Sequence, residues 1–136
     1  MKTTGNTIFI SGGSAGIGLA IAQKFSALGN KVIINGRNTE RLEKALAKLS
    51  NAVAIQGDLS VEADRIRIAE DLKANHPDVN MIINNAGAAF GYLLSETTNA
   101  HKKAEIEMNT NYLAIIHFTE LMLPHLLTKD VAAIVN

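Results

Sequence analysis

The stretch TIFISGGSAGIG, residues 7–18, decides the fold of this chain. Its first four residues are β-branched or aromatic and predict a short buried strand, while the glycines that follow predict a tight turn. Beyond the turn, a helix is predicted from apolar residues at helical spacing, and Gly29 ends it; the apolar residues are Ile17, Ile21, Phe25 and Leu28. The free amides at the start of such a helix can bind a pyrophosphate, although a purely structural turn has the same composition.

The rest of the chain repeats this alternation of strand and helix. Helices are predicted after possible caps at Asn38 or Thr39 and at Ser60, and a loop at 85–98 precedes a long helix at 101–128. Apolar strands that alternate with helices predict an α/β fold with a doubly wound parallel sheet. The further strands are expected at 31–35, 52–55, 80–84 and 131–135. The helix residues expected to face the core are Leu42, Ala45, Leu46, Leu49, Ile68, Leu72, Tyr112, Ile116, Thr119 and Leu123.

Size and charge limit the classes of function. The chain of 136 residues forms one domain at most, and its 13 basic residues balance 13 acidic ones. A neutral surface favours neither nucleic acid nor an anionic membrane, so we expect neither partner. The chain has no cysteine and no closely spaced histidines, which predicts no metal site, and a cysteine-free chain is typical of a cytoplasmic protein.

Four motifs occur in the order and spacing of one enzyme family. Ser11–Gly18 resembles the fingerprint Thr-Gly-x-x-x-Gly-x-Gly, with Ser in place of Thr, and Asn84–Gly87 matches Asn-Asn-Ala-Gly after the fourth strand. Asp58-Leu59 follows the third strand, and Asn111 lies thirteen residues before Pro124. The whole chain therefore resembles the short-chain dehydrogenases/reductases, in particular bacterial oxidoreductases encoded near lipoteichoic-acid D-alanylation genes. The resemblance implies a Rossmann-like sheet and an NAD(P)-dependent oxidoreductase that moves hydride between nicotinamide and a small carbonyl or alcohol substrate.

The resemblance also implies roles for the residues of these motifs. Asp58 would accept a hydrogen bond from the adenine amino group, and Asn111 would be the catalytic asparagine, in a locally distorted helix with a water on the proton-relay path. Structural interpretations stay open, because the glycines can pack helix against sheet, Asp58 can mark a helix entry and Asn85 can hold neighbouring backbone. The implied cofactor-binding residues are Ser11, Gly12, Ser14, Gly16, Ile17, Gly18, Asp58, Leu59, Asn85, Ala86 and Gly87.

The end of the second predicted strand bears on the choice of cofactor. An acidic residue there would bind the adenosine ribose hydroxyls and repel a 2′-phosphate. This chain has Asn35-Gly36-Arg37 instead, and a guanidinium suits a phosphate. Arg37 therefore joins the cofactor-binding residues and we predict NADP(H) over NAD(H), the alternative being that Arg37 is only a solvated loop cation.

The last residues of the chain carry an expectation about its completeness. An apolar strand ends at Asn136, where it lacks the neighbours that a central strand needs. The family's catalytic Ser would follow within two or three residues, and neither Tyr92 nor Tyr112 has a lysine four residues later. We therefore expect residues 1–136 to be the N-terminal dinucleotide-binding part of one Rossmann domain, truncated after about five strands. Such a chain would bind cofactor weakly, catalyse no turnover and, by resemblance, form a homo-oligomer through the long helix.

Two other classes of function stay open at this point. A non-catalytic module could sense the NADP redox state for a partner, although Asn111 would then have no proton to relay. A bare α/β scaffold could retain a vestigial glycine turn, and failure to bind either dinucleotide would favour that alternative.

Overall fold

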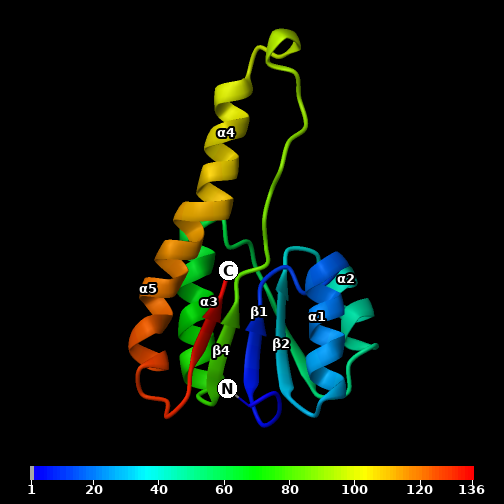
Figure 1. Cartoon of the computed structure of the whole chain (residues 1–136), viewed down its shortest axis with the longest axis vertical. Helices are drawn as coiled ribbons and strands as arrows, with labels where there is room; N and C mark the ends of the chain where they lie inside the picture. The colour runs from blue at the N-terminus through cyan, green and yellow to red at the C-terminus, as the bar shows by residue number, and fades with distance from the viewer. Residues whose placement is uncertain (1) are drawn as a thin grey trace.

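Five parallel strands form one sheet in the order β3-β2-β1-β4-β5 within residues 2–136, the part of the chain that this computed structural model describes (Figure 1). The order reverses between β1 and β4, so the chain winds outward from β1 first in one direction and then in the other. The predicted doubly wound parallel sheet is therefore confirmed. The strands are β1 (Thr7–Ile10), β2 (Lys31–Gly36), β3 (Ala52–Gln56), β4 (Val79–Ile83) and β5 (Ala133–Val135).

Each face of the sheet has its own pair of helices. The first pair is α1 (Gly16–Ala27) and α2 (Thr39–Leu46), and the second is α3 (Glu62–Asn75) and α5 (Ala114–Leu126). Strand β1 contributes to both cores: Ile8 and Ile10 belong to the core of the first pair, while Phe9 packs on Phe118 of α5, with 5.1 Å between ring centroids. Burial on both faces explains why these strands are continuously apolar.

Helix α1 packs mainly with small residues, and of the four apolar residues that predicted it only Ile21 and Phe25 pack, partly buried, against the core. Its buried residues are Gly18, Ala22 and Ser26, whereas Ile17 is 75% exposed. A Cβ at Gly18 would lie 2.4 Å from the carbonyl oxygen of Gly12, so the helix approaches the glycine turn more closely than a larger side chain allows. That close approach selects small residues for the inner face and leaves the larger ones at its sides.

The stripe predicted for the long helix was also wrong. The structure buries Ala114, Phe118, Met122 and Leu126 of α5, and leaves Tyr112, Ile116 and Leu123 exposed. The sequence places apolar residues on both faces of this helix, so periodicity alone cannot select the face that meets the sheet.

One predicted helix cap is confirmed and one is wrong. Asn38 caps α2, because its side chain accepts a hydrogen bond from the backbone nitrogen of Arg41. Ser60 does not cap α3, because that helix begins at Glu62 and Val61 is its N-cap. The Ser60 hydroxyl instead donates to Asp58 Oδ1 at 2.7 Å, which keeps the chain in a turn after β3.

The predicted helix at 101–128 consists of three consecutive segments. These are α4 (Ala100–Met108), the π-helical turn η2 (Asn109–Leu113) and α5. Helix α4 extends beyond the sheet together with the chain that leads to it, which contains the short 3-10 helix η1 (Leu94–Glu96) (Figure 1). We call residues 86–108 the arm.

Candidate functional site

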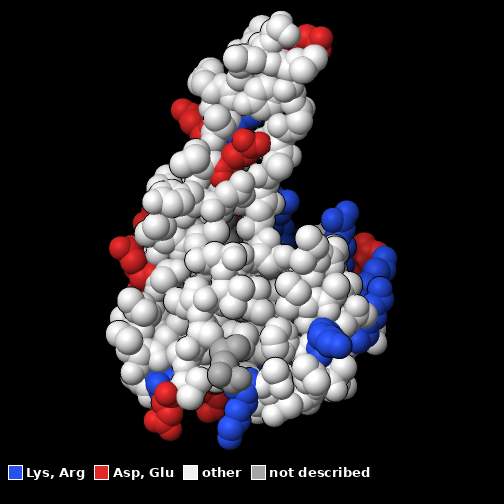
Figure 2. Space-filling model, in the orientation of Figure 1, with Lys and Arg blue, Asp and Glu red and all other residues white. Residues whose placement is uncertain are grey.

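A cavity of about 890 Å³ opens at the carboxyl ends of the strands. It lies at the switch point, where the strand order reverses between β1 and β4. Doubly wound sheets bind ligands at this position. Figure 2 shows a hollow beside the arm, with basic side chains on the side of α1 and α2. The lining includes nine of the predicted site residues: Ser11, Gly12, Ser14, Arg37, Asp58, Leu59, Asn85, Ala86 and Gly87.

The glycine turn brings two stretches of backbone into close contact. Gly12 has φ +66°, and a Cβ there would lie 2.9 Å from Asn85 Nδ2 and 3.1 Å from the Cα of Ala86. Gly16 also has a positive φ, +54°, at the start of α1. Gly16, Ile17 and Gly18 are not part of the cavity lining, so they shape the turn from behind it.

Ser11 joins the glycine turn to the end of β4. Its hydroxyl oxygen accepts hydrogen bonds from the backbone nitrogens of Asn85 and Ala86, both at 2.9 Å. The Asn85 side chain returns the contact by donating to the Ser11 carbonyl at 2.9 Å. Ser11 is only 2% exposed, and its hydroxyl also lies 3.4 Å from the carbonyl oxygen of Ile83. These bonds fix the two sides of the switch point relative to each other.

Two arginines stand at the rim of the cavity near the end of β2. Arg37 is 79% exposed and lies 3.6 Å from Asp58 Oδ2, a loose surface ion pair. Arg41, in the first turn of α2, also lines the cavity. Sequence analysis missed Arg41, although its place four residues after Arg37 and near a helix start was a usable signal.

The turn after β3 is held by side chains. Asp64 Oδ2 accepts a hydrogen bond from the Asp58 backbone nitrogen at 2.7 Å, and Asp58 Oδ1 accepts from the Ser60 backbone nitrogen at 2.9 Å. The bond from Asp58 and the contact with Arg67 hold the pKa of the Asp64 carboxyl below its usual range. Asp58 and Leu59 are thus presented to the cavity by a preformed turn.

Asn111 lies in the π-helical turn, which confirms the expected helix distortion. The backbone nitrogen of Ala114 donates to the carbonyl of Asn109, five residues earlier. The Asn111 side chain holds Ala88 by two hydrogen bonds and is outside the cavity lining, whereas neighbouring Thr110 is part of it.

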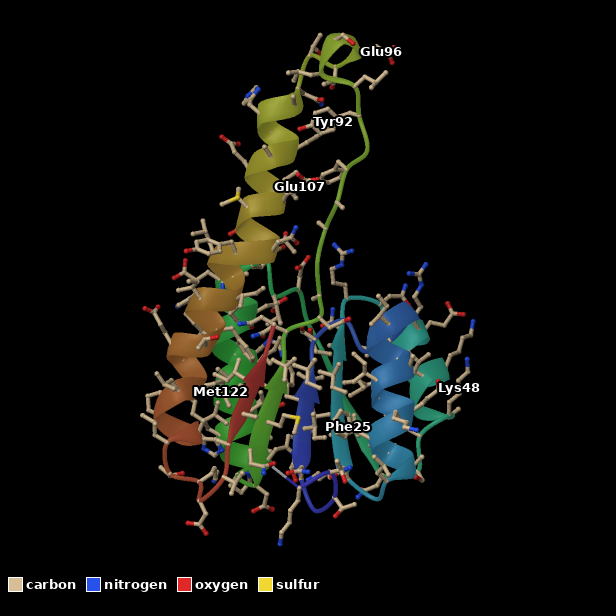
Figure 3. All side chains as sticks on the ribbon, in the orientation of Figure 1. Phe25, Lys48, Tyr92, Glu96, Glu107 and Met122 are labelled. Atoms are coloured by element: carbon tan, nitrogen blue, oxygen red, sulfur yellow. The ribbon has the colours of Figure 1, made fainter. Side chains whose placement is uncertain are left out.

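The chain after Ala88 runs extended beside α4 and is tied to it at alternate residues. Glu107 Oε1 accepts from the Phe90 backbone nitrogen at 2.6 Å, and Lys103 Nζ lies 4.7 Å from the centre of the Tyr92 ring. Figure 3 shows Tyr92 and Glu107 between the two segments of the arm. Two extended residues span about 6.6 Å and four helical residues span about 6 Å. Every second residue of the extended chain therefore lies opposite every fourth residue of the helix.

The histidines make structural contacts. His117 Nδ1 accepts from Arg65 Nε at 3.0 Å, and His125 Nε2 lies 3.1 Å from the carbonyl oxygen of Val79. Burial, and then the charge of Lys31, lower the pKa of His76. Within residues 2–136, no group of three or more His, Asp or Glu side chains is placed to bind a metal ion, and no helix has the length and apolar character needed to cross a membrane.

The known proteins that this chain resembles are dehydrogenases and oxidoreductases. A family model for short chain dehydrogenases matches residues 6–136. The oxidoreductase DltE of Bacillus subtilis, from the dlt operon, is 38% identical over the whole chain, which covers 54% of DltE. An NADP-dependent 3-hydroxy acid dehydrogenase of Salmonella typhi, YdfG, is 31% identical over 95% of the chain and 52% of its own length.

A solved structure agrees with these relatives. A short-chain dehydrogenase from Sphingobium yanoikuyae in complex with NADPH aligns with a TM-score of 0.81 and 27% identity, covering 95% of this chain and 51% of that one. The chain thus spans about half the length of the relatives that it matches. The switch-point cavity, the glycine turn and the matched family model together show that the chain belongs to the short-chain dehydrogenase family.

Proposed function

We propose that this chain is the dinucleotide-binding part of a single Rossmann domain, and that the whole protein is an NADP(H)-dependent oxidoreductase acting on a small carbonyl or alcohol. The observation that carries the proposal is the cavity at the switch point. Its lining includes backbone with small or no side chains from the segments that follow β1 and β4. Bound NADP(H) would supply or accept the hydride. Residues 2–136 would bind and orient the dinucleotide.

The glycine turn fits the pyrophosphate of such a cofactor. Side chains at Gly12 and Gly87 would reach Asn85 and Asn111, respectively, so only a bare backbone leaves this part of the cavity open. The start of α1 behind the turn has backbone amides without helical partners, which favour an anion. Ala86 and Gly87 likewise leave room at the opposite wall.

The end of β2 favours NADP(H) over NAD(H). Gly36 stands where an acidic residue would repel a 2′-phosphate, and even a Cβ added at this position would lie 3.0 Å from Ser14 Oγ. Arg37 and Arg41 then offer two cations at the same rim. The Arg37–Asp58 pair is weak because it is loose and exposed, so Arg37 is free to bind phosphate while Asp58 accepts a bond from adenine.

Asn111 is the one member of the family's catalytic set that we assign to this chain. Its helix is distorted at the turn where that set places an ordered water on the proton-relay path. The tyrosines of the chain are not followed by a lysine at the fourth position, so we expect the chain to catalyse no turnover. We also expect it to bind dinucleotide weakly, because it spans about half the length of its relatives and lacks the walls on the nicotinamide side. The predicted cytoplasmic location stays a prediction, and so does assembly as a homo-oligomer, for which exposed Tyr112, Ile116 and Leu123 offer an apolar surface.

The experiment that tests the proposal is a paired titration of the chain with NADPH and NADH, followed by nicotinamide fluorescence. We expect saturable binding of NADPH and weaker binding of NADH. Equal affinities would contradict the cofactor preference. A folded chain that binds neither dinucleotide would contradict the binding function itself.

A further inference from the structure

Three consecutive residues in the turn after β3 are each held through the backbone by a side chain from a helix. Asp64 binds the nitrogen of Asp58, as described above. Arg65 Nη1 donates to the carbonyl of Leu59 at 2.7 Å. Asn109 Nδ2 donates to the carbonyl of Ser60 at 3.0 Å. A turn outside regular structure depends on such partners, because its polar backbone groups lack strand or helix neighbours.

Arg65 is unusual for a charged residue. It is only 7% exposed, and its side chain reaches from α3 to α5, where Nε donates to His117 Nδ1. A buried guanidinium needs hydrogen-bond acceptors, and the two that the structure gives it are an imidazole nitrogen and the Leu59 carbonyl. The side chain therefore fixes Leu59 from the core of the protein.

Asn109 lies in the same π-helical turn as Asn111 but binds the opposite side of the cavity. Asn109 holds Ser60, in the turn that carries Asp58, and Asn111 holds Ala88, after β4. One helical turn thus connects the loops that follow β3 and β4. Neither asparagine is part of the cavity lining, and Arg65 is not part of it either.

We propose that Asn109 and Arg65 are positioning residues, which set the affinity for the adenosine end of the cofactor by fixing the backbone of residues 58–60. This inference rests on the proposed dinucleotide binding. The two side chains act on the ligand only through Leu59 and Ser60, so their loss should weaken adenosine binding without changing the environment of the nicotinamide.

The test uses the substitution N109D in the full 136-residue chain. Aspartate has the shape of asparagine but lacks the amide donor and places a negative oxygen against the Ser60 carbonyl. The ligands are NADPH and adenosine 2′,5′-bisphosphate, which has no nicotinamide. We expect N109D to weaken both ligands by the same factor of about three to ten, the range for one lost hydrogen bond. The emission maximum of bound NADPH should stay unchanged, because Asn111 still holds Ala88.

Two further variants separate positioning from general destabilisation. N51D makes the same charge change on an exposed side chain and should bind both ligands like the unmodified chain. N109Q keeps the amide donor and should recover part of the affinity that N109D loses. Combined with R65M, N109D should weaken adenosine bisphosphate less than the product of the two single effects, because both residues act on the same turn.

The outcomes distinguish this inference from the proposed function. If the unmodified chain binds neither ligand, the proposed function fails. If it binds both and N109D equals N51D, dinucleotide binding stands and the positioning role of Asn109 is overturned. A loss confined to NADPH, with a shifted emission maximum, would also overturn the role, because it would place the effect of Asn109 at the nicotinamide.

Discussion

Asn111 binds both backbone polar groups of Ala88: its side-chain oxygen accepts from the Ala88 nitrogen at 2.8 Å, and its amide nitrogen donates to the Ala88 carbonyl at 2.7 Å. The side chain thereby makes the two backbone hydrogen bonds that a neighbouring strand would make with Ala88. Because Ala88 follows directly after the Asn84–Gly87 motif, this contact fixes the start of the extended chain that runs from the cavity toward η1.

Residues 88–91, the extended start of the arm, should show alternating amide protection. The Ala88 and Phe90 nitrogens donate to Asn111 and Glu107, whereas those of Ala89 and Gly91 have no acceptor among the described residues. Hydrogen exchange followed by NMR should therefore find slow exchange at 88 and 90 and fast exchange at 89 and 91. E107A should release Phe90 alone, and E107Q, which keeps an acceptor, should retain most of its protection. Uniformly fast exchange over 88–91 would show that this extended segment is not held by Asn111 and Glu107.

The two rim arginines should account for the preference between cofactors. R37A and R41A should each weaken NADPH by about ten-fold, the effect of losing one hydrogen bond to a charged group, and change NADH little. K48A removes the same charge beyond the end of α2, where Figure 3 places Lys48 at the exposed periphery, and serves as the control. Calorimetric titration measures all three. Equal losses for NADPH and NADH would assign these arginines to a group that the two cofactors share.

Gly18 should be the least replaceable residue of the glycine turn. A Cβ there would lie 2.4 Å from the Gly12 carbonyl oxygen and 2.5 Å from Asn85 Nδ2. We expect G18A to lower the free energy of unfolding by about 1–3 kcal/mol, the usual cost of overpacking, and to abolish dinucleotide binding. G91A is the matched control, because a Cβ at Gly91 meets nothing within 4 Å. Urea unfolding measures both, and a G18A chain as stable as G91A would mean that α1 can move away from the turn without cost.

Asp64 predicts a pH dependence of stability. Its pKa in the folded chain lies below the usual value of 3.8, so the folded state binds fewer protons than the unfolded state as this carboxyl titrates. The stabilisation is present above pH 3.8 and is lost as the pH falls through the folded pKa. D64A should therefore lower the urea midpoint at pH 7 and have a smaller effect near pH 2.5. D130N, on an exposed residue, controls for charge. A D64A effect that is the same at both pH values would assign the loss to packing.

The sequence predicted the strands because their apolar runs are short, continuous and separated by clear turns. It also predicted nine residues of the cavity lining, since residues such as Gly12, Asp58 and Ala86 occur in motifs placed at strand ends. It did not predict which side of a helix faces the sheet where both sides are apolar, as Phe118 and Ile116 show in α5.

The positioning residues could not be predicted for a different reason. Arg65 and Asn109 act on Leu59 and Ser60 through contacts between segments that are close only in the folded chain. In the sequence, Arg65 resembles an ordinary exposed helix residue. Only the packing of α3 on α5 shows that it is buried.

The π-helical turn also determines the direction in which the arm faces. A π turn contains about one residue more than an α turn, and one residue corresponds to about 100° of rotation around a helix. Removing one residue from Asn109–Leu113 would leave the helix almost as long but rotate α4 about its own axis relative to α5. Lys103 and Glu107 would then point away from Tyr92 and Phe90, and the wall beside the cavity would lose its support. The number of residues in this single turn therefore sets the orientation of the arm. Inserting or deleting a residue here would rotate one wall of the site and leave the sheet unchanged.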